Sequence, residues 1–191
     1  VGSPYKTMAF PNRPPQDAEY LELKELSPSE LARWKAGMRL FLKRVAYRKP
    51  RPIVLKSPPH TARVRTLLEL FPDAKFVHIV REPVNVFLST VRLWRSLYQV
   101  QGLQVDNGHD VSEHVLSTFE RMYGSFEEDR PLLKPGYYFE VRYEDLVADP
   151  VGQIGAMYHQ LSLGDFEHVR PKLEAFLEAK KDYQTNRVEP P

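Results

Sequence analysis

The chain has 191 residues, enough for one domain with a sizeable core. Its 27 basic and 25 acidic residues leave a net charge of only +2, which argues against nucleic acid as a partner. There are no cysteines, so disulfides and zinc–thiolate sites are excluded, and the histidine spacing fits no metal site. No apolar run is long enough to span a membrane and no signal-peptide pattern opens the chain, so we expect a cytoplasmic protein.

The N-terminal part predicts an arm followed by a long helix. Residues 1–26 are rich in proline and lack periodicity, which is typical of an extended arm. Ser27, Pro28 and Glu30 then form the pattern of a helix start, with Ser27 as the N-cap. Apolar residues at helical spacing continue to Val45, before a proline-rich segment that ends the helix.

The remaining chain alternates short apolar strands with helices. We expect three strands and the helices between them, with Asp110 capping the helix that begins at Val111. Strands separated by helices predict an α/β fold with a parallel sheet, in one domain over residues 1–191. Three strands are few for such a domain, so we expect the sheet to be incomplete at the N-terminus. The expected strands cover residues 53–56, 76–80 and 137–142.

Basic residues follow the predicted strands at their carboxyl ends. Lys56, Arg81 and Arg142 stand where the strands end, and helix starts come next. Ligands of open parallel sheets bind at this edge, and helix N-termini favour anions, so the pattern predicts a phosphate site. Arg81 would offer a planar fork and Ser89 a hydroxyl to one phosphate. The residue spacing is equally compatible with a structural role, in which Arg81 pairs with a surface carboxylate and Ser89 is exposed to solvent.

Two segments of the chain resemble a known family. They read VLKSPPHTARVRTLLELFPDAKFVHIVREPVNVFLSTVRLW and, further on, RYEDLVADP. Both are similar to sulfotransferases that use 3′-phosphoadenosine 5′-phosphosulfate (PAPS), in the bacterial and tyrosylprotein-like branch. The resemblance runs from about residue 50 to 190. It implies a three-layer αβα fold of the P-loop-NTPase type and an enzyme that transfers a sulfuryl group from PAPS to a hydroxyl or amine.

The resemblance also implies roles for individual residues. Arg81 and Ser89 match the element that binds the 3′-phosphate, and Tyr143 matches the tyrosine near the adenine. Lys56 matches the lysine that contacts the sulfuryl group. In the last stretch, Tyr183 and Arg187 stand where the family makes further cofactor contacts. Glu82 departs from the usual Asp and predicts a slightly looser helix start.

The chain lacks one family feature. Members carry a glycine-rich loop around the 5′-phosphosulfate, whereas the first 36 residues here contain only Gly2. We therefore expect the C-terminal portion of a sulfotransferase with half of the cofactor site, inactive as a fragment. A missing N-terminal segment or a second copy of the chain would cover the open sheet edge.

The catalytic base and the acceptor are less well defined by the sequence. His60 lies one turn beyond Lys56 and suits proton removal near neutral pH, although it can equally be a capping or solvated residue. The acceptor can be a small molecule, a carbohydrate or a peptide. Arg63 and Arg65 are interpreted as solvated residues of a helix face.

Two other functions compete with sulfuryl transfer. One is a small-molecule kinase of similar build, against which the absence of a Gly-x-x-x-x-Gly-Lys-Ser/Thr motif argues. The other is a non-catalytic remnant that binds nucleotide or serves as an interaction module, which the missing loop favours.

Overall fold

The computed structural model describes residues 5–108 and 110–182 and divides the chain into two compact units. The first unit comprises the chain up to Pro72 together with Val91–Leu132. The second unit comprises Asp73–Thr90 and the chain from Leu133 onward. Each unit is built from segments distant in sequence, and we describe each by itself.

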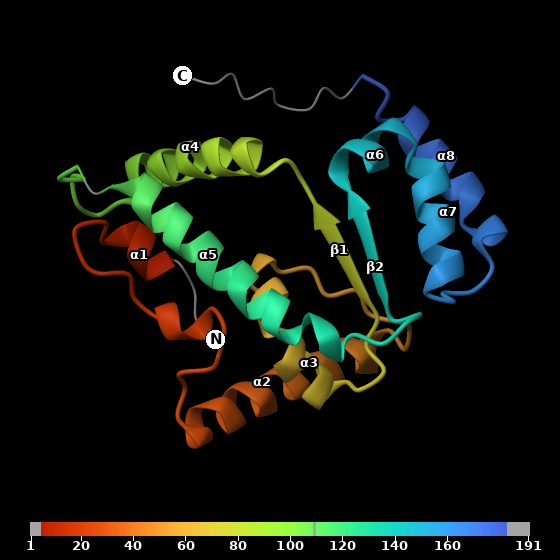
Figure 1. Ribbon diagram of the computed structural model, residues 1–191, viewed down its shortest axis with the longest axis horizontal. Coiled ribbons are helices and arrows are strands. Elements are labelled where there is room, and N and C mark those ends of the chain that lie inside the picture. Colours follow the sequence, from red (N-terminus) through yellow and green to blue (C-terminus); the bar gives the residue numbers. More distant parts are fainter. Residues whose placement is uncertain (1–4, 109, 183–191) are drawn as a thin grey trace. The chain divides into compact units, whose positions relative to one another are not determined.

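The second unit is built on a small parallel sheet (Figure 1). Strand β1 (Phe76–Val80) pairs in parallel with β2 (Tyr138–Arg142), from Phe76 opposite Tyr138 to Val80 opposite Arg142. The predicted α/β class and parallel pairing are therefore confirmed. After β2 come four short helices: α6 (Tyr143–Ala148), α7 (Pro150–Gln160), η4 (Phe166–His168) and α8 (Arg170–Glu178).

Alternation along β2 decides which side of this sheet is packed. Phe139 and Val141 are buried together with Leu161, which follows α7, and Leu146 and Met157 pack against them. Successive strand residues point to opposite faces, so burying these two turns Glu140 to the other face. There Glu140 bonds the Nδ1 atom of His78 at 3.1 Å.

The first unit contains the long helix that the capping pattern predicts. Helix α2 (Pro28–Arg48) begins after Ser27, whose side chain and that of Glu30 make the reciprocal capping box. Its Trp34 is buried in a cluster with Leu23 and Leu70. The predicted N-cap is thus confirmed, and the packed side of the helix is the one that carries Trp34.

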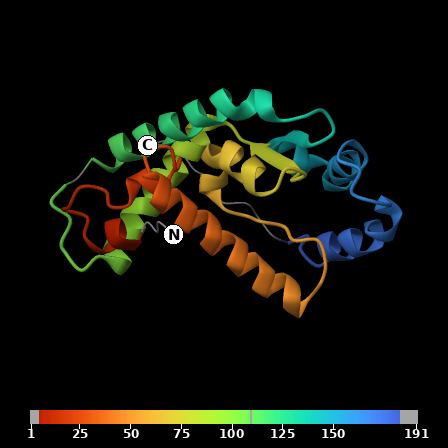
Figure 2. The same cartoon turned by 90° about the horizontal axis from the view of Figure 1, so that it is seen from below.

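Helix α5 (Val111–Asp129) packs against η2 (Pro58–Arg63) and α3 (Val64–Leu70) in the same unit (Figure 2). Asp110 caps α5 by accepting from two backbone N–H groups, as predicted. The hydroxyl of Ser125 donates to the carbonyl of Ala62 at 3.2 Å and joins the packed elements. The remaining elements are α1 (Tyr5–Ala9), η1 (Ala18–Tyr20), α4 (Pro83–Gln101), which starts directly after β1, and η3 (Arg130–Leu132).

The expected strand at residues 53–56 is wrong. This segment is irregular, and its central residue Val54 is 92% exposed. A strand is stabilised by hydrogen bonds to a neighbouring strand, and within the described residues the sheet consists of β1 and β2 alone. An apolar run between prolines was therefore not enough to form a strand.

The interpretation of Arg63 as a solvated residue is also wrong. Its side chain is buried, with the guanidinium 5.4 Å from the ring of Trp34. It donates from Nε to the carbonyl of Leu21 at 3.0 Å and from Nη2 to that of Tyr20. Burial lowers the pKa of Arg63 to about 10. Arg63 therefore ties the segment after η1 to the helical core of the first unit.

Candidate functional site

Arg81 and Tyr143 meet at the carboxyl ends of the two strands. The register places Val80 opposite Arg142. The residues that follow the two strands, Arg81 and Tyr143, therefore leave the sheet at the same edge. The guanidinium carbon of Arg81 lies 4.5 Å from the centre of the Tyr143 ring, a cation–π contact. Among the residues with described positions, no carboxylate forms a salt bridge with Arg81, although the charges of Arg81 and Glu144 interact. The guanidinium is held by an aromatic ring, which leaves its N–H groups for an anion.

Glu82 caps helix α4 well, despite the expectation of a looser start. One of its carboxylate oxygens accepts from the N–H of Val84 at 3.1 Å and the other from that of Asn85 at 2.7 Å. Its longer side chain thus reaches both amides. Because these amides are taken by Glu82, an anion at this edge depends on side chains such as Arg81 more than on the helix N-terminus.

Glu144 links the two strand ends from the other side. Its Oε1 atom accepts from the backbone N–H of Glu82 at 3.3 Å, and its Oε2 atom lies 3.9 Å from Nε of Arg142. Hydrogen bonds from its own backbone N–H and from that of Glu82 hold the pKa of Glu144 below its usual range. It is therefore a fixed negative charge beside Arg81. Sequence reasoning missed this role, because it depends on the register of the two strands, which the structure supplies.

Ser89 lies two turns into α4, and its hydroxyl is engaged within the helix. It donates to the carbonyl of Val86 at 3.0 Å, and the same carbonyl accepts from the hydroxyl of Thr90 at 2.7 Å. Because Thr90 also satisfies this carbonyl, rotation of the Ser89 hydroxyl toward a ligand would leave no carbonyl unpaired.

The two expected catalytic residues belong to the first unit. Lys56 is exposed, in the irregular segment before η2. His60 lies in η2, and its Nδ1 atom is buried without a hydrogen-bond partner in the described part of the chain. Burial, followed by the charge of Arg63, lowers the pKa of His60, so its imidazole is neutral at pH 7. A neutral imidazole is the form that accepts a proton.

The lowered pKa of His60 makes the stability of the first unit depend on pH. The unfolded state binds a proton near the ordinary value of about 6.5, whereas the folded state resists it. The stabilisation is therefore complete above that pH and lost as the pH falls below it. We expect the free energy of unfolding to fall between pH 7 and pH 5, and to fall less in His60→Gln. Urea titrations at several pH values measure the free energy of unfolding of each protein. The control is His168→Gln, which replaces an exposed histidine. An unchanged pH dependence in His60→Gln would contradict the assignment.

Tyr183 and Arg187 lie outside the residues that the structure describes. No trio of potential metal ligands gathers in the described ranges 5–108 and 110–182. Across these same ranges, no helix has the length and apolar character needed to cross a bilayer.

The comparisons with known proteins agree with this architecture. The fold is α/β, with a basic residue and an aromatic ring where its two parallel strands end. A family model described as "Sulfotransferase family" matches residues 4–167, and the chain belongs to that family of transferases. It is also similar to omega-hydroxy-beta-dihydromenaquinone-9 sulfotransferase Stf3 of Mycobacterium bovis and of Mycobacterium tuberculosis. The identity to each is 45% over 184 residues.

The match covers the two proteins unequally. It includes 96% of this chain but 47% of each relative, so the chain spans about half the length of the curated relatives it matches. No solved structure matches the chain. The family assignment thus rests on sequence, and the structure adds the local geometry.

Proposed function

We propose that this chain carries the nucleotide-binding side of a sulfotransferase that uses PAPS. The observation that supports it most is Arg81, which stacks on Tyr143 and forms no salt bridge with a carboxylate among the residues with described positions, although the charge of Glu144 lies beside it. An arginine fork suits a phosphate, and the 3′-phosphate distinguishes PAPS from common nucleotides. Arg81 would hold that phosphate and Ser89 would add a hydroxyl. Since Arg81 covers one face of the Tyr143 ring, the adenine would lie against the other face or its edge.

The donor supplies an activated sulfuryl group, which an acceptor oxygen attacks in line. In this proposal Lys56 neutralises charge on the bridging oxygen as its bond to sulfur breaks, and His60 takes the acceptor's proton. The neutral state of His60 supports its part, because it can accept a proton at pH 7. Positioning and charge stabilisation would supply most of the catalysis.

The acceptor we propose is a lipid-soluble alcohol. The two curated relatives are named for omega-hydroxy-beta-dihydromenaquinone-9, a name that includes a hydroxyl group. At 45% identity over almost the whole chain, a related prenylated alcohol is the acceptor class to test first. The kinase alternative has no support from the family match, and the binding-only alternative is tested below by the transfer assay.

Two measurements test the proposal. By calorimetry we expect adenosine 3′,5′-bisphosphate (PAP) to bind at least about tenfold more tightly than adenosine 5′-phosphate, because only PAP carries the 3′-phosphate. Radiolabelled PAPS with an omega-hydroxylated menaquinone then reports transfer, with a short water-soluble alcohol as control. Selective PAP binding without transfer would favour the binding-only remnant. Equal affinities for the two nucleotides would contradict the proposal altogether.

A further inference from the structure

Glu144 joins the two chain segments that carry the Arg81–Tyr143 pair. The paired register of β1 and β2 ends one residue before each member of this pair, so both lie beyond the strand ladder. Glu144 follows Tyr143 directly, and Glu82 follows Arg81 directly. The Oε1 atom of Glu144 accepts from the backbone N–H of Glu82 at 3.3 Å. A side-chain hydrogen bond thus links the two segments beyond the last residue pair of the sheet.

This hydrogen bond anchors the peptide group between Arg81 and Glu82. The N–H that Glu144 accepts belongs to this planar group, so the bond restricts rotation of the backbone at Arg81. Glu82 is also held by its own carboxylate, which accepts from two N–H groups at the start of α4. The backbone on the carboxyl side of Arg81 is therefore fixed where its guanidinium carbon lies 4.5 Å from the centre of the Tyr143 ring.

The charge of Glu144 lies among arginines. Its Oε2 atom is buried without a hydrogen-bond partner in the described part of the chain and lies 3.9 Å from Nε of Arg142. The charge of Arg81 also acts on this carboxylate. Burying a carboxylate oxygen is costly unless nearby cations offset its desolvation, which keeps Glu144 beside the two arginines. Because its negative charge opposes a phosphate, Glu144 can favour phosphate binding only through the placement of Arg81.

We propose that Glu144 is a positioning residue for Arg81, which holds the Arg81 guanidinium on the Tyr143 ring in the orientation that receives a 3′-phosphate. The identity of the ligand rests on the proposed function, whereas the positioning rests on the contacts of Glu144 alone. Glu144 has no contact with the nucleotide in this proposal. Selectivity for PAP over adenosine 5′-phosphate then depends on a residue that acts through Arg81.

Two substitutions separate the hydrogen bond of Glu144 from its charge. Glu144→Gln and Glu144→Ala both remove the charge, but only glutamine keeps an oxygen that can accept the N–H of Glu82. Calorimetry with PAP and adenosine 5′-phosphate measures the ratio of the two affinities. We expect this ratio to be about tenfold lower in Glu144→Ala than in Glu144→Gln. In an Arg81→Ala background Glu144→Ala should not change the ratio further, since Glu144 acts through Arg81.

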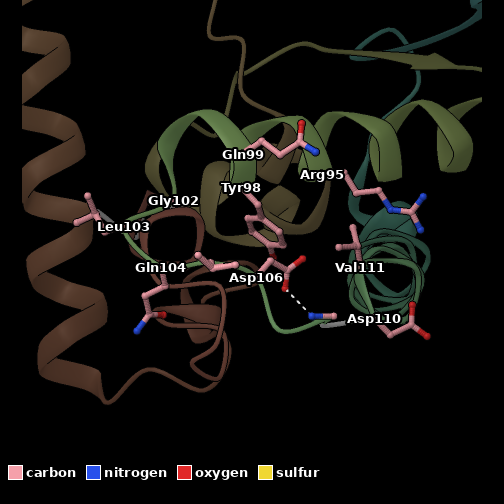
Figure 3. A pocket seen from close by; sticks show the side chains of 11 residues that line it. Arg95, Tyr98, Gln99, Gly102, Leu103, Gln104, Asp106, Asp110 and Val111 are labelled. Carbon is pink, nitrogen blue, oxygen red and sulfur yellow. Dashed lines mark hydrogen bonds between the residues drawn. The ribbon is translucent and has the colours of Figure 1, made fainter.

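Asp106→Ala is the matched control in the first unit. Asp106 is likewise a carboxylate that accepts a backbone N–H, from Gly108 at 3.2 Å, and it lines the hollow shown in Figure 3. Its replacement removes the same charge and the same kind of hydrogen bond without touching the Arg81–Tyr143 pair. The affinity ratio of this variant should equal that of the wild type.

Nuclear magnetic resonance tests the positioning without any nucleotide. Side-chain protons of an arginine that lies over an aromatic ring resonate upfield, so the Hδ protons of Arg81 report its contact with Tyr143. We expect the upfield shift in the wild type and in Glu144→Gln, and its loss in Glu144→Ala. An unchanged shift in Glu144→Ala would overturn the proposal.

The two measurements distinguish this proposal from the proposed function. In a wild-type chain that prefers PAP, equal ratios in the two Glu144 variants would overturn the positioning role alone. The same would follow if Glu144→Ala lowered the ratio equally with and without Arg81. A wild-type chain that shows the upfield shift but binds both nucleotides equally would refute the proposed function alone.

Discussion

Replacing Arg81 with alanine should weaken PAP binding by about ten- to a hundredfold, since a hydrogen-bonded pair with a charged group is worth roughly 1.5–3 kcal/mol. The affinity for adenosine 5′-phosphate should barely change, because that nucleotide has no 3′-phosphate for the fork to hold. Calorimetry with both ligands measures the two losses. Arg81→Lys should recover part of the PAP affinity, as it keeps the charge but not the planar fork.

Two comparisons make this result specific to the fork. Arg170→Ala removes the same charge from α8 in the same unit, where Arg170 pairs with Glu167, and should leave PAP binding unchanged. Ser89→Ala should cost less than Arg81→Ala, because a neutral hydroxyl already bonded to Val86 is lost. Equal losses for the two nucleotides in Arg81→Ala would mean that Arg81 acts by holding Tyr143 in place.

Asp129→Ala should lower the free energy of unfolding of the first unit by about 3 kcal/mol. The Asp129 carboxylate is fully buried and joins the end of α5 to the start of α3. It accepts from the backbone N–H of Arg65 at 3.1 Å and from its Nε at 3.0 Å. Alanine leaves that amide without a partner, whereas the half-exposed guanidinium can turn to water, which keeps the loss moderate.

Urea unfolding followed by tryptophan fluorescence measures this loss, because both tryptophans, Trp34 and Trp94, belong to the first unit. Glu127→Ala is the matched control: this exposed residue of the same helix pairs with Arg130 at 3.5 Å and should contribute under about 0.5 kcal/mol. Asp129→Asn should fall between the two, because an amide oxygen can still accept from Arg65. A loss in Asp129→Ala no larger than in Glu127→Ala would show that the buried carboxylate is unimportant.

The residues that act locally could be predicted from the sequence. Ser27 with Glu30, and Asp110, cap helices through amides two or three residues away, so a short stretch of chain determines them. Strands β1 and β2 were also predicted, because their apolar runs are bounded by polar segments and each finds the other as a partner. The order of Arg81, a helix start and Ser89 is likewise local, and it led to the phosphate hypothesis.

Whatever depended on a distant partner was decided only by the tertiary structure. Residues 53–56 have an apolar pattern like that of β1, yet without a neighbouring strand in the described chain they form no ladder. Arginine is a residue type usually found at the surface. Arg63 is nevertheless buried, because the carbonyls of Tyr20 and Leu21 and the ring of Trp34 surround it. The stacking of Arg81 on Tyr143 required the register of two strands separated by more than fifty residues. In each case the free energy comes from a contact between segments far apart in sequence, and a local pattern carries no record of which segments will meet.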